Sequence, residues 1–304
     1  GGANVQFAIN PLDEDDIIVI EMNPRVSRSS ALASKATGYP IAKISALLAV
    51  GYTLPEILND ITKASPVCFE PTLDYVAVKI PIFPFSKFPQ TDQFLGPQMR
   101  SVGEVLGIGS NFNEAFLKAL RSLEMDLDVP ELSRIKYLPS EFTKESTMAR
   151  LGKSCELSLL TVLESLRQGG QKAEIFKACQ ITPWFIDQME IIKELEDKIK
   201  NCKASILSDS DLVYRAKQLG FSDKYLARIS QHSEREVFEF RQKQGIHPVY
   251  KAVDTCSAEF IAKTPYYYST YQSENEAVPF NQLGKRSVAI LGSGPNRIGQ
   301  GIEF

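Results

Sequence analysis

Strand and helix signals are distributed unevenly along this chain of 304 residues. Short apolar runs that favour strands lie mainly in residues 1–124, where helical stretches separate them. From about Met125 to Ala277 these runs nearly disappear, and residues that cap helices recur. The pattern therefore predicts an α+β first part and an all-α second part, with a domain boundary near residue 124.

Three strands and two helices are predicted in the first part. The strands cover residues 5–9, 17–23 and 75–80. A helix rich in Ser and Ala covers residues 27–37 and ends at Gly38. A second helix covers residues 113–123 and places four apolar side chains on one face: Phe116, Ala119, Leu120 and Leu123.

Two helices of the second part have clear start signals. Thr182 is a candidate N-cap, and Pro183 suits the first helical position. Ser233 and Glu236 form a capping box that opens another helix, which Gly245 would close. The predicted apolar face of the helix that begins at Pro183 contains Phe185, Met189, Ile192, Leu195 and Ile199.

Composition argues against several kinds of partner. The 34 basic and 37 acidic residues are interspersed, so neither a nucleic-acid surface nor a membrane-surface patch is predicted. No apolar run reaches the roughly 20 residues of a membrane span. The five cysteines lie far apart and the two histidines lack a companion at ligand spacing. A zinc site, a disulfide framework and histidine-based catalysis are therefore not expected.

Both ends of the chain are expected to be interrupted. The chain opens with Gly1-Gly2 and has no secretory signal, which predicts a cytoplasmic protein or a segment from inside a longer one. An organellar parent stays open, because its transit peptide would lie upstream. Near the far end, residues 273–285 suit a linker, and a predicted strand over residues 287–291 begins just before the chain stops.

The strand over residues 17–23 ends in polar groups that suggest chemistry. Glu21 and Asn23 are two residues apart, so they point to the same face of a strand. A hairpin with residues 5–9 would place Gln6 opposite Glu21 on that face. Carboxylate and amide oxygens are ligands for a hard cation such as Mg²⁺, which usually also binds substrate phosphates. A metal bound to a nucleotide is the functional interpretation.

Two arginines just beyond this strand fit the same interpretation. Arg25 and Arg28 would place fixed positive charge where a transferred phosphate or a small anion sits. The alternative is a surface cluster of salt bridges at a strand end, formed by Glu21, Asn23 and the two arginines. Spacing alone does not separate these two hypotheses.

Other candidate motifs favour structural roles. The glycines of residues 291–301 follow a predicted strand, but Gly299 comes five residues after Gly294, which departs from the dinucleotide fingerprint. A structural turn is the preferred interpretation. Trp184 with its neighbouring Phe, and the tyrosines from Tyr266 onward, are expected in a core or an interface. Cys256 has no histidine to activate it, so a packed thiol is expected.

Four segments resemble the large-chain family of carbamoyl-phosphate synthetases. The longest begins Glu21-Met-Asn-Pro-Arg-Val-Ser-Arg and continues to Tyr39-Pro. The others are Ser101-Val-Gly-Glu-Val, His247-Pro-Val-Tyr-Lys-Ala-Val-Asp-Thr-Cys and Gly294-Pro-Asn-Arg-Ile-Gly-Gln-Gly. The core Glu-x-Asn-x-Arg is shared by many ATP-grasp ligases. The resemblance therefore depends on the four segments in the family's order.

The resemblance implies three structural pieces. Residues 1–124 would be the C-terminal part of the ATP-grasp domain of the carboxyphosphate half. Residues 125–282 would be an all-α helical oligomerisation domain. Residues 283–304 would contain the first strand of a Rossmann-like pre-ATP-grasp domain, which opens the carbamoyl-phosphate half.

The resemblance also implies roles for particular residues. By match to the family motif, Gln6, Glu21 and Asn23 correspond to metal ligands, with Gln6 and Glu21 also close to the nucleotide. Arg25 resembles the arginine that meets bicarbonate or carboxyphosphate, and Arg28 is the second catalytic candidate. The implied cofactors are ATP, Mg²⁺ or Mn²⁺, and K⁺.

The family's enzymes make carbamoyl phosphate from bicarbonate, ammonia derived from glutamine, and two ATP. The reaction passes through carboxyphosphate and carbamate and feeds pyrimidine and arginine biosynthesis. Arg28 and Glu104 resemble residues near the ammonia passage. The implied partners are a small glutamine amidotransferase chain and further copies bound through the helical domain. Nucleotide contacts are expected upstream of Gly1, so this chain alone is expected to lack synthetase activity.

Two alternatives belong to other classes. The chain could serve only as a structural and oligomerisation module, with helical faces packed against another copy. It could also come from another ATP-grasp ligase or carboxylase. The helical segment followed by the glycine-rich block of residues 291–301 disfavours the second alternative.

Overall fold

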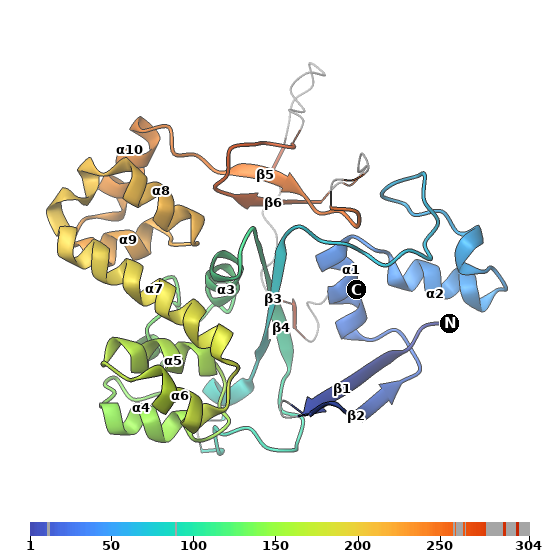
Figure 1. Cartoon of the computed structure of the whole chain (residues 1–304), viewed down its shortest axis with the longest axis horizontal. Coiled ribbons are helices and arrows are strands. Elements are labelled where there is room, and N and C mark those ends of the chain that lie inside the picture. The colour runs from blue at the N-terminus through green and yellow to red at the C-terminus, as the bar shows by residue number, and fades with distance from the viewer. Residues whose placement is uncertain are drawn as a thin grey trace.

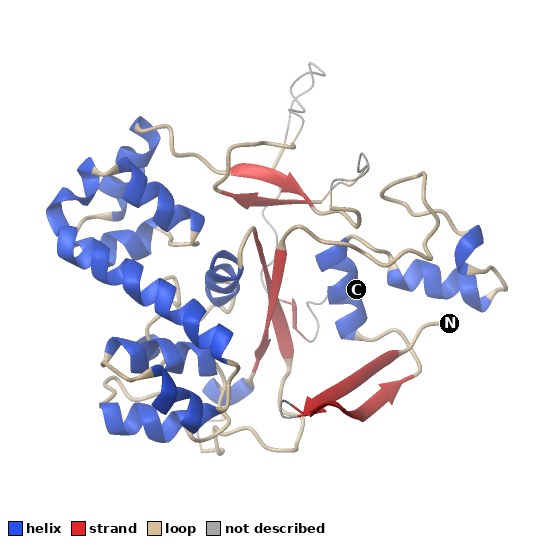
Figure 2. Cartoon of the chain, viewed as in Figure 1, coloured by secondary structure: helices blue, strands red, loops and turns tan. Residues whose placement is uncertain are grey.

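A short antiparallel sheet stands between two groups of helices in the computed structural model (Figure 1). The structure describes residues 1–10, 13–88, 90–257, 259, 264, 266–277, 288–289 and 296–297. At Glu14, Arg28, Lys203, Ala204, Asn296 and Arg297 it describes the backbone alone. Helices and strands alternate in the first part, and helices dominate the second (Figure 2).

The chain begins with a hairpin of two strands, β1 (Asn4–Asn10) and β2 (Asp13–Asn23). Both predicted strands are confirmed, and the antiparallel register pairs Gln6 with Glu21. The hairpin projects beside α1 (Figure 1). Its apolar side chains are exposed on both faces: Val5, Phe7, Ile9, Ile17, Ile18, Val19, Ile20 and Met22.

Two helices and a small apolar core follow the hairpin. Helix α1 (Arg28–Thr37) begins after Ser27, whose side chain accepts a hydrogen bond from the Ser30 backbone N–H. It ends at Gly38 as predicted, where a φ of 73° suits glycine. Helix α2 (Ile41–Ala49) and the 3₁₀ turn η1 (Leu54–Glu56) complete this region. Its buried core residues are Ile44, Ile57 and Val67.

The central sheet has the strand order β3-β4-β7. Its strands are β3 (Val76–Ile82), β4 (Gly103–Gly109) and β7 (Asn296–Arg297), and the short turn η2 (Pro84–Ser86) follows β3. Helix α3 (Phe112–Arg121) packs on β4, because Gly107 leaves room for it. A Cβ at Gly107 would lie 2.1 Å from the Ala115 carbonyl oxygen. The strand and helix predicted here are both confirmed.

The second part is built mainly from helices. Helix α7 (Pro183–Cys202) starts at the predicted proline, and α10 (Glu234–Lys243) starts with the predicted capping box. On α7 the buried face includes Ile186, which the prediction omitted, whereas Phe185 is half-buried. The other elements are η3 (Leu132–Arg134), α4 (Lys144–Leu151), α5 (Ser158–Arg167), α6 (Lys172–Cys179), η4 (Lys203–Ser208), α8 (Ser210–Gln218) and α9 (Asp223–Ser230).

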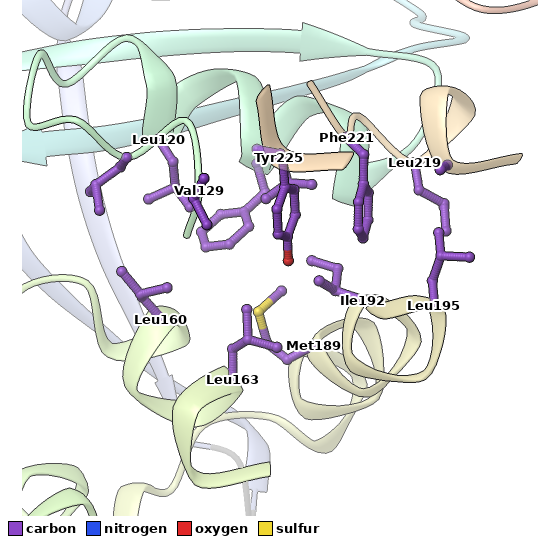
Figure 3. Packing of buried hydrophobic residues seen from close by; sticks show 14 of the residues in the cluster. Leu120, Val129, Leu160, Leu163, Met189, Ile192, Leu195, Leu219, Phe221 and Tyr225 are labelled. Atoms are coloured by element: carbon purple, nitrogen blue, oxygen red, sulfur yellow. The ribbon is translucent and has the colours of Figure 1, made fainter. Parts of the chain in front are cut away.

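One large apolar core connects α3 with these helices. Figure 3 shows Leu120 of α3, Leu163 of α5 and Met189 of α7 directed toward one another. The rings of Phe221 and Tyr225 stack with their centroids 4.3 Å apart. The core continues into β3 and β4, so it runs across the predicted boundary near residue 124.

The prediction that residues 125–277 are all helical is wrong at two places. Strands β5 (Val249–Ala252) and β6 (Tyr267–Thr270) form an antiparallel pair. Each is only four residues long, too short for a clear period-two pattern, and each pairs with a partner distant in sequence. The segment between them returns to the first part, where the Thr72 N–H donates to the Thr255 carbonyl oxygen at 2.9 Å.

Predictions for the last residues fall largely outside the described part of the chain. Of the expected strand over residues 287–291, only residues 288 and 289 are described, and neither is in a strand. Of residues 291–301, only the two residues of β7 are described, and they pair with β4. Within the described ranges, no helix has both the length and the apolar character that crossing a membrane requires.

Candidate metal and nucleotide site

Three oxygen-bearing side chains meet on one face of the β1–β2 hairpin. Gln6 and Glu21 are directly opposite each other, and Asn23 follows Glu21 by two residues. The Gln6 Nε2 donates to Glu21 Oε1 at 3.0 Å, and the Asn23 Nδ2 donates to the same oxygen at 3.1 Å. The convergence predicted from strand periodicity is therefore present.

The geometry of this cluster suits a cation that brings further ligands with it. Both hydrogen bonds within the cluster fall on Glu21 Oε1, and no described residue bonds to its second carboxylate oxygen, which can therefore serve as a metal ligand. Among the described residues, no group of three or more His, Cys, Asp or Glu gathers to hold a metal. A cation bound here would be coordinated by one carboxylate and by amide oxygens. This set of ligands fits an Mg²⁺ ion that also binds substrate phosphates.

The two predicted catalytic arginines follow the hairpin. Arg25 is exposed, its backbone N–H donates to the Asn23 carbonyl oxygen at 2.8 Å, and its Nη1 lies 3.4 Å from the Val26 carbonyl oxygen. Its guanidinium therefore retains donors for an anion. Arg28 is the first residue of α1, and its side chain lies outside the described residues.

Glu104 lies on β4, in a different sheet from Glu21. Its side chain is buried and pairs with Lys79 of β3, with 2.5 Å between Nζ and Oε2. Its other oxygen, Oε1, is buried and has no hydrogen-bond partner among the described residues. Lys79 was not predicted. The antiparallel pairing places Pro81 opposite Glu104, so Lys79 is a diagonal neighbour that could be found once the register was known.

The cysteine and aromatic residues considered in the sequence analysis lie in surroundings that favour a structural role. Cys256 is buried, and its backbone N–H donates to Asp254 Oδ1 at 2.9 Å. Trp184 is half exposed and makes edge contacts with the rings of Phe112 and Phe185. Of the tyrosines, Tyr266 and Tyr267 are exposed. The expectation of a packed thiol is confirmed, and Trp184 is not a core residue.

A buried charge network in the second part was not predicted. Glu196 of α7 accepts hydrogen bonds from Arg167 of α5 and from the Tyr225 hydroxyl. Burial would raise the pKa of Glu196, but the hydrogen bond and charge of Arg167 outweigh it, so the pKa lies below its ordinary value. These residues line a cavity of about 480 Å³. Because their charges compensate one another, the network is a structural element.

Comparison with known protein families finds two types of domain in the chain, with residues 58–103 between the two matched segments. Residues 1–57, which contain the hairpin and α1, match the family model for the carbamoyl-phosphate synthase L chain ATP binding domain. Residues 104–245, from β4 to just after α10, match the model for the carbamoyl-phosphate synthetase large chain oligomerisation domain. Strands β5 and β6 lie beyond the second match.

Individual relatives match the chain over its whole length. The carbamoyl phosphate synthase large chain of Streptomyces coelicolor is 52% identical over 304 residues, and that of Archaeoglobus fulgidus is 50% identical over 313 aligned positions. Both alignments include 100% of this chain. The chain belongs to the carbamoyl-phosphate synthetase large-chain family. It spans about a quarter of the length of these carbamoyl-phosphate synthetase relatives, 26% and 28% respectively.

Proposed function

We propose that this chain supplies the metal-binding half of an ATP site in a carbamoyl-phosphate synthetase large chain. The observation that carries the proposal is the hairpin register, which brings Gln6, Glu21 and Asn23 together. These residues lie in the segment that matches the family's ATP-binding domain. An isolated surface salt bridge would not need two amides on one carboxylate.

Each residue of the proposed site has a distinct task. Glu21 would bind Mg²⁺ or Mn²⁺ through its available oxygen, and the amide oxygens of Gln6 and Asn23 would rotate toward the ion. The metal, when bound with ATP, would draw charge from the phosphates during phosphoryl transfer. Arg25 would hold the anionic bicarbonate or carboxyphosphate beside it, and Arg28 would add charge at the start of α1.

The proposal extends to the larger protein of which such a chain would be part. That protein would be an ATP-dependent ligase that forms carbamoyl phosphate from bicarbonate and ammonia through carboxyphosphate and carbamate. A glutamine amidotransferase small chain would supply the ammonia, and Glu104 would line its passage. The division into residues 1–124, 125–282 and 283–304 belongs to this proposal, with β5 and β6 packed back on the first part.

Titration of Mg²⁺ and ATP into the chain tests the metal site. Wild type should show saturable binding, and Glu21→Gln should abolish it, because the variant removes the carboxylate charge. Asp15→Asn removes one charge from the same hairpin away from the cluster and should leave binding unchanged. Equal binding by wild type and Glu21→Gln, or no binding by wild type, would contradict the proposal.

A second function, self-association through the helical part, has its own support. Residues 104–245 match a domain described as an oligomerisation domain. Sedimentation velocity over a range of chain concentrations should show a species larger than the monomer, and its fraction should rise with concentration. A monomer at every concentration would contradict self-association and would leave the proposed metal site unaffected.

A further inference from the structure

A largely apolar cavity of about 700 Å³ lies at the junction between the central sheet and the helical part. Its lining residues come from separate stretches of the chain: residues 82–88, Val102, residues 123–126 and residues 136–137. The Val102 N–H donates to the Ile82 carbonyl oxygen at 2.8 Å, which joins two of these stretches. A third contains Leu123, which is buried in the large apolar core. The cavity is therefore built on the best-packed region of the molecule.

Aromatic rings and a thioether form much of the cavity lining. These side chains are Phe83, Phe88, Tyr137 and Met125. The buried ring of Phe85 supports two of them from behind, since it stacks on Phe83 with 5.5 Å between centroids and meets Tyr137 edge-on at 6.4 Å. Aromatic rings and methionine sulfur both make favourable contacts with a further aromatic ring. The lining is therefore suited to a planar aromatic group.

The charged side chains of the lining balance one another. They are two lysines and two carboxylates, all exposed: Lys87, Lys136, Glu124 and Asp126. Asp126 is also paired with Arg134 and Lys224, each at 2.9 Å, and each of these cations has a second carboxylate partner. A charged ligand would gain no net attraction and would lose hydration among the apolar walls. The cavity therefore favours an uncharged ligand.

The turn that carries Met125 has an unusual backbone conformation. Glu124 and Asp126, on either side of Met125, have φ values of 58° and 57°. This left-handed region disfavours residues other than glycine, so it persists only where the surrounding structure imposes it, and it is frequent at ligand sites. Here the ion pairs of Asp126 hold the turn. The turn thereby fixes Met125 at the cavity wall.

We propose that this cavity binds an uncharged, planar aromatic small molecule. Its volume lies within the range of about 300 to 1,000 Å³ that is usual for pockets of small organic ligands. An apolar lining with a few polar groups is also the usual construction of such pockets. The bound ring would contact Phe83, Phe88 and Met125, and it would bridge the sheet and the helical part. The lining includes no residue of the proposed metal site, so each proposal can fail without the other.

Methyl NMR of the 304-residue chain, isotope-labelled at its methionine methyl groups, tests this proposal with indole as the probe. Of the five methionines, Met125 lines the cavity, Met22 is exposed on the hairpin and Met189 is in the core. Indole should shift the Met125 signal saturably through its ring current, with a Kd on the order of 1 mM or below. The signals of Met22 and Met189 should not move. A Met125→Leu variant assigns the Met125 signal.

A charged analogue of the probe tests the preference for an uncharged ligand. Indolecarboxylate has the same ring system with one negative charge, and it should bind at least about fivefold more weakly than indole, because its carboxylate loses hydration. Failure of the Met125 signal to shift with indole, or a shift confined to Met22, would overturn the proposal. Equal or tighter binding of indolecarboxylate would do the same.

A variant that fills the cavity gives an independent test. Val102→Trp places a large side chain at a half-buried position of the lining and should weaken indole binding at least about tenfold. Val50→Trp is the matched control, since Val50 is 74% exposed and lies outside the cavity, and it should bind as wild type does. Circular dichroism and an unchanged Met189 signal identify variants that keep the fold. Unchanged affinity in folded Val102→Trp would contradict the assignment of the site.

Discussion

Replacing Glu196 with glutamine should destabilise the helical part of the chain by about 3 kcal/mol. The Glu196 side chain is 1% exposed, and Arg167 Nε and the Tyr225 hydroxyl both donate to it, the former at 3.0 Å. Removing one partner of a buried ion pair costs about 3 to 5 kcal/mol. The lower end applies because Arg167 retains a second carboxylate, Glu164, at 3.2 Å.

Urea unfolding followed by tryptophan fluorescence measures this loss. Trp184 is the chain's single tryptophan and lies at the start of α7, so it reports on the part that contains Glu196. With a slope of about 2 kcal/mol per molar urea, the midpoint should fall by about 1.5 M. Glu164→Gln is the matched control, because it removes the more exposed carboxylate and should cost less than about 1 kcal/mol. Equal shifts for the two variants would refute the reasoning.

Three further changes have predictable directions. Gly220→Ala should lower the thermal midpoint, because a φ of +89° costs a non-glycine residue about 1 kcal/mol or more and the new Cβ meets α3; an unchanged midpoint would contradict this. Leu163→Ala should cost about 2 to 5 kcal/mol in urea unfolding, since the side chain is fully buried, whereas a smaller loss would mean that the core collapses around the cavity. The pKa of Lys217 is about 8 in the folded chain and 10.5 ordinarily, so the unfolded chain binds more protons between these values. Wild type should therefore gain stability over Lys217→Met as the pH rises through that window, and parallel urea midpoints across it would contradict the assignment.

The pairing of Gln6 with Glu21 could be predicted because its information is local, although β1 and β2 extend beyond the predicted bounds of 5–9 and 17–23. Two strands close together in sequence can pair in few ways, and period two then places Glu21 and Asn23 on one face. The acidic residues from Asp13 to Asp16, expected in the connecting loop, belong instead to β2. Helix starts at Pro183 and Ser233 were predictable for the same reason, since caps depend on neighbouring residues. Metal binding by Glu21 remains a prediction. Residue spacing indicates where the oxygen atoms lie, but it does not indicate which ion they bind.

The charged clusters could not be predicted, because they depend on tertiary packing. Arg167 and Glu196 are 29 residues apart, and Arg121 and Gly220 are 99 apart. Nothing in the sequence near Arg121 shows that its neighbours will be Lys217 and the α8–α9 turn. Strands β5 and β6 were not predicted for a related reason. Each has only four residues, too few for a clear period-two pattern, and each pairs with a segment elsewhere in the chain.

The return of residues 254 and 255 to the first part has a consequence for synthesis on the ribosome. The Tyr75 hydroxyl donates to the Asp254 carbonyl oxygen at 3.2 Å across 179 positions, and the Asn59 amide donates to Thr255 Oγ1 at 3.2 Å across 196. At about 5 to 20 residues per second, these partners emerge about 10 to 40 s later. Until residues 254 and 255 have been synthesised, these contacts cannot form, so chaperones have access to this side of the first part during the interval.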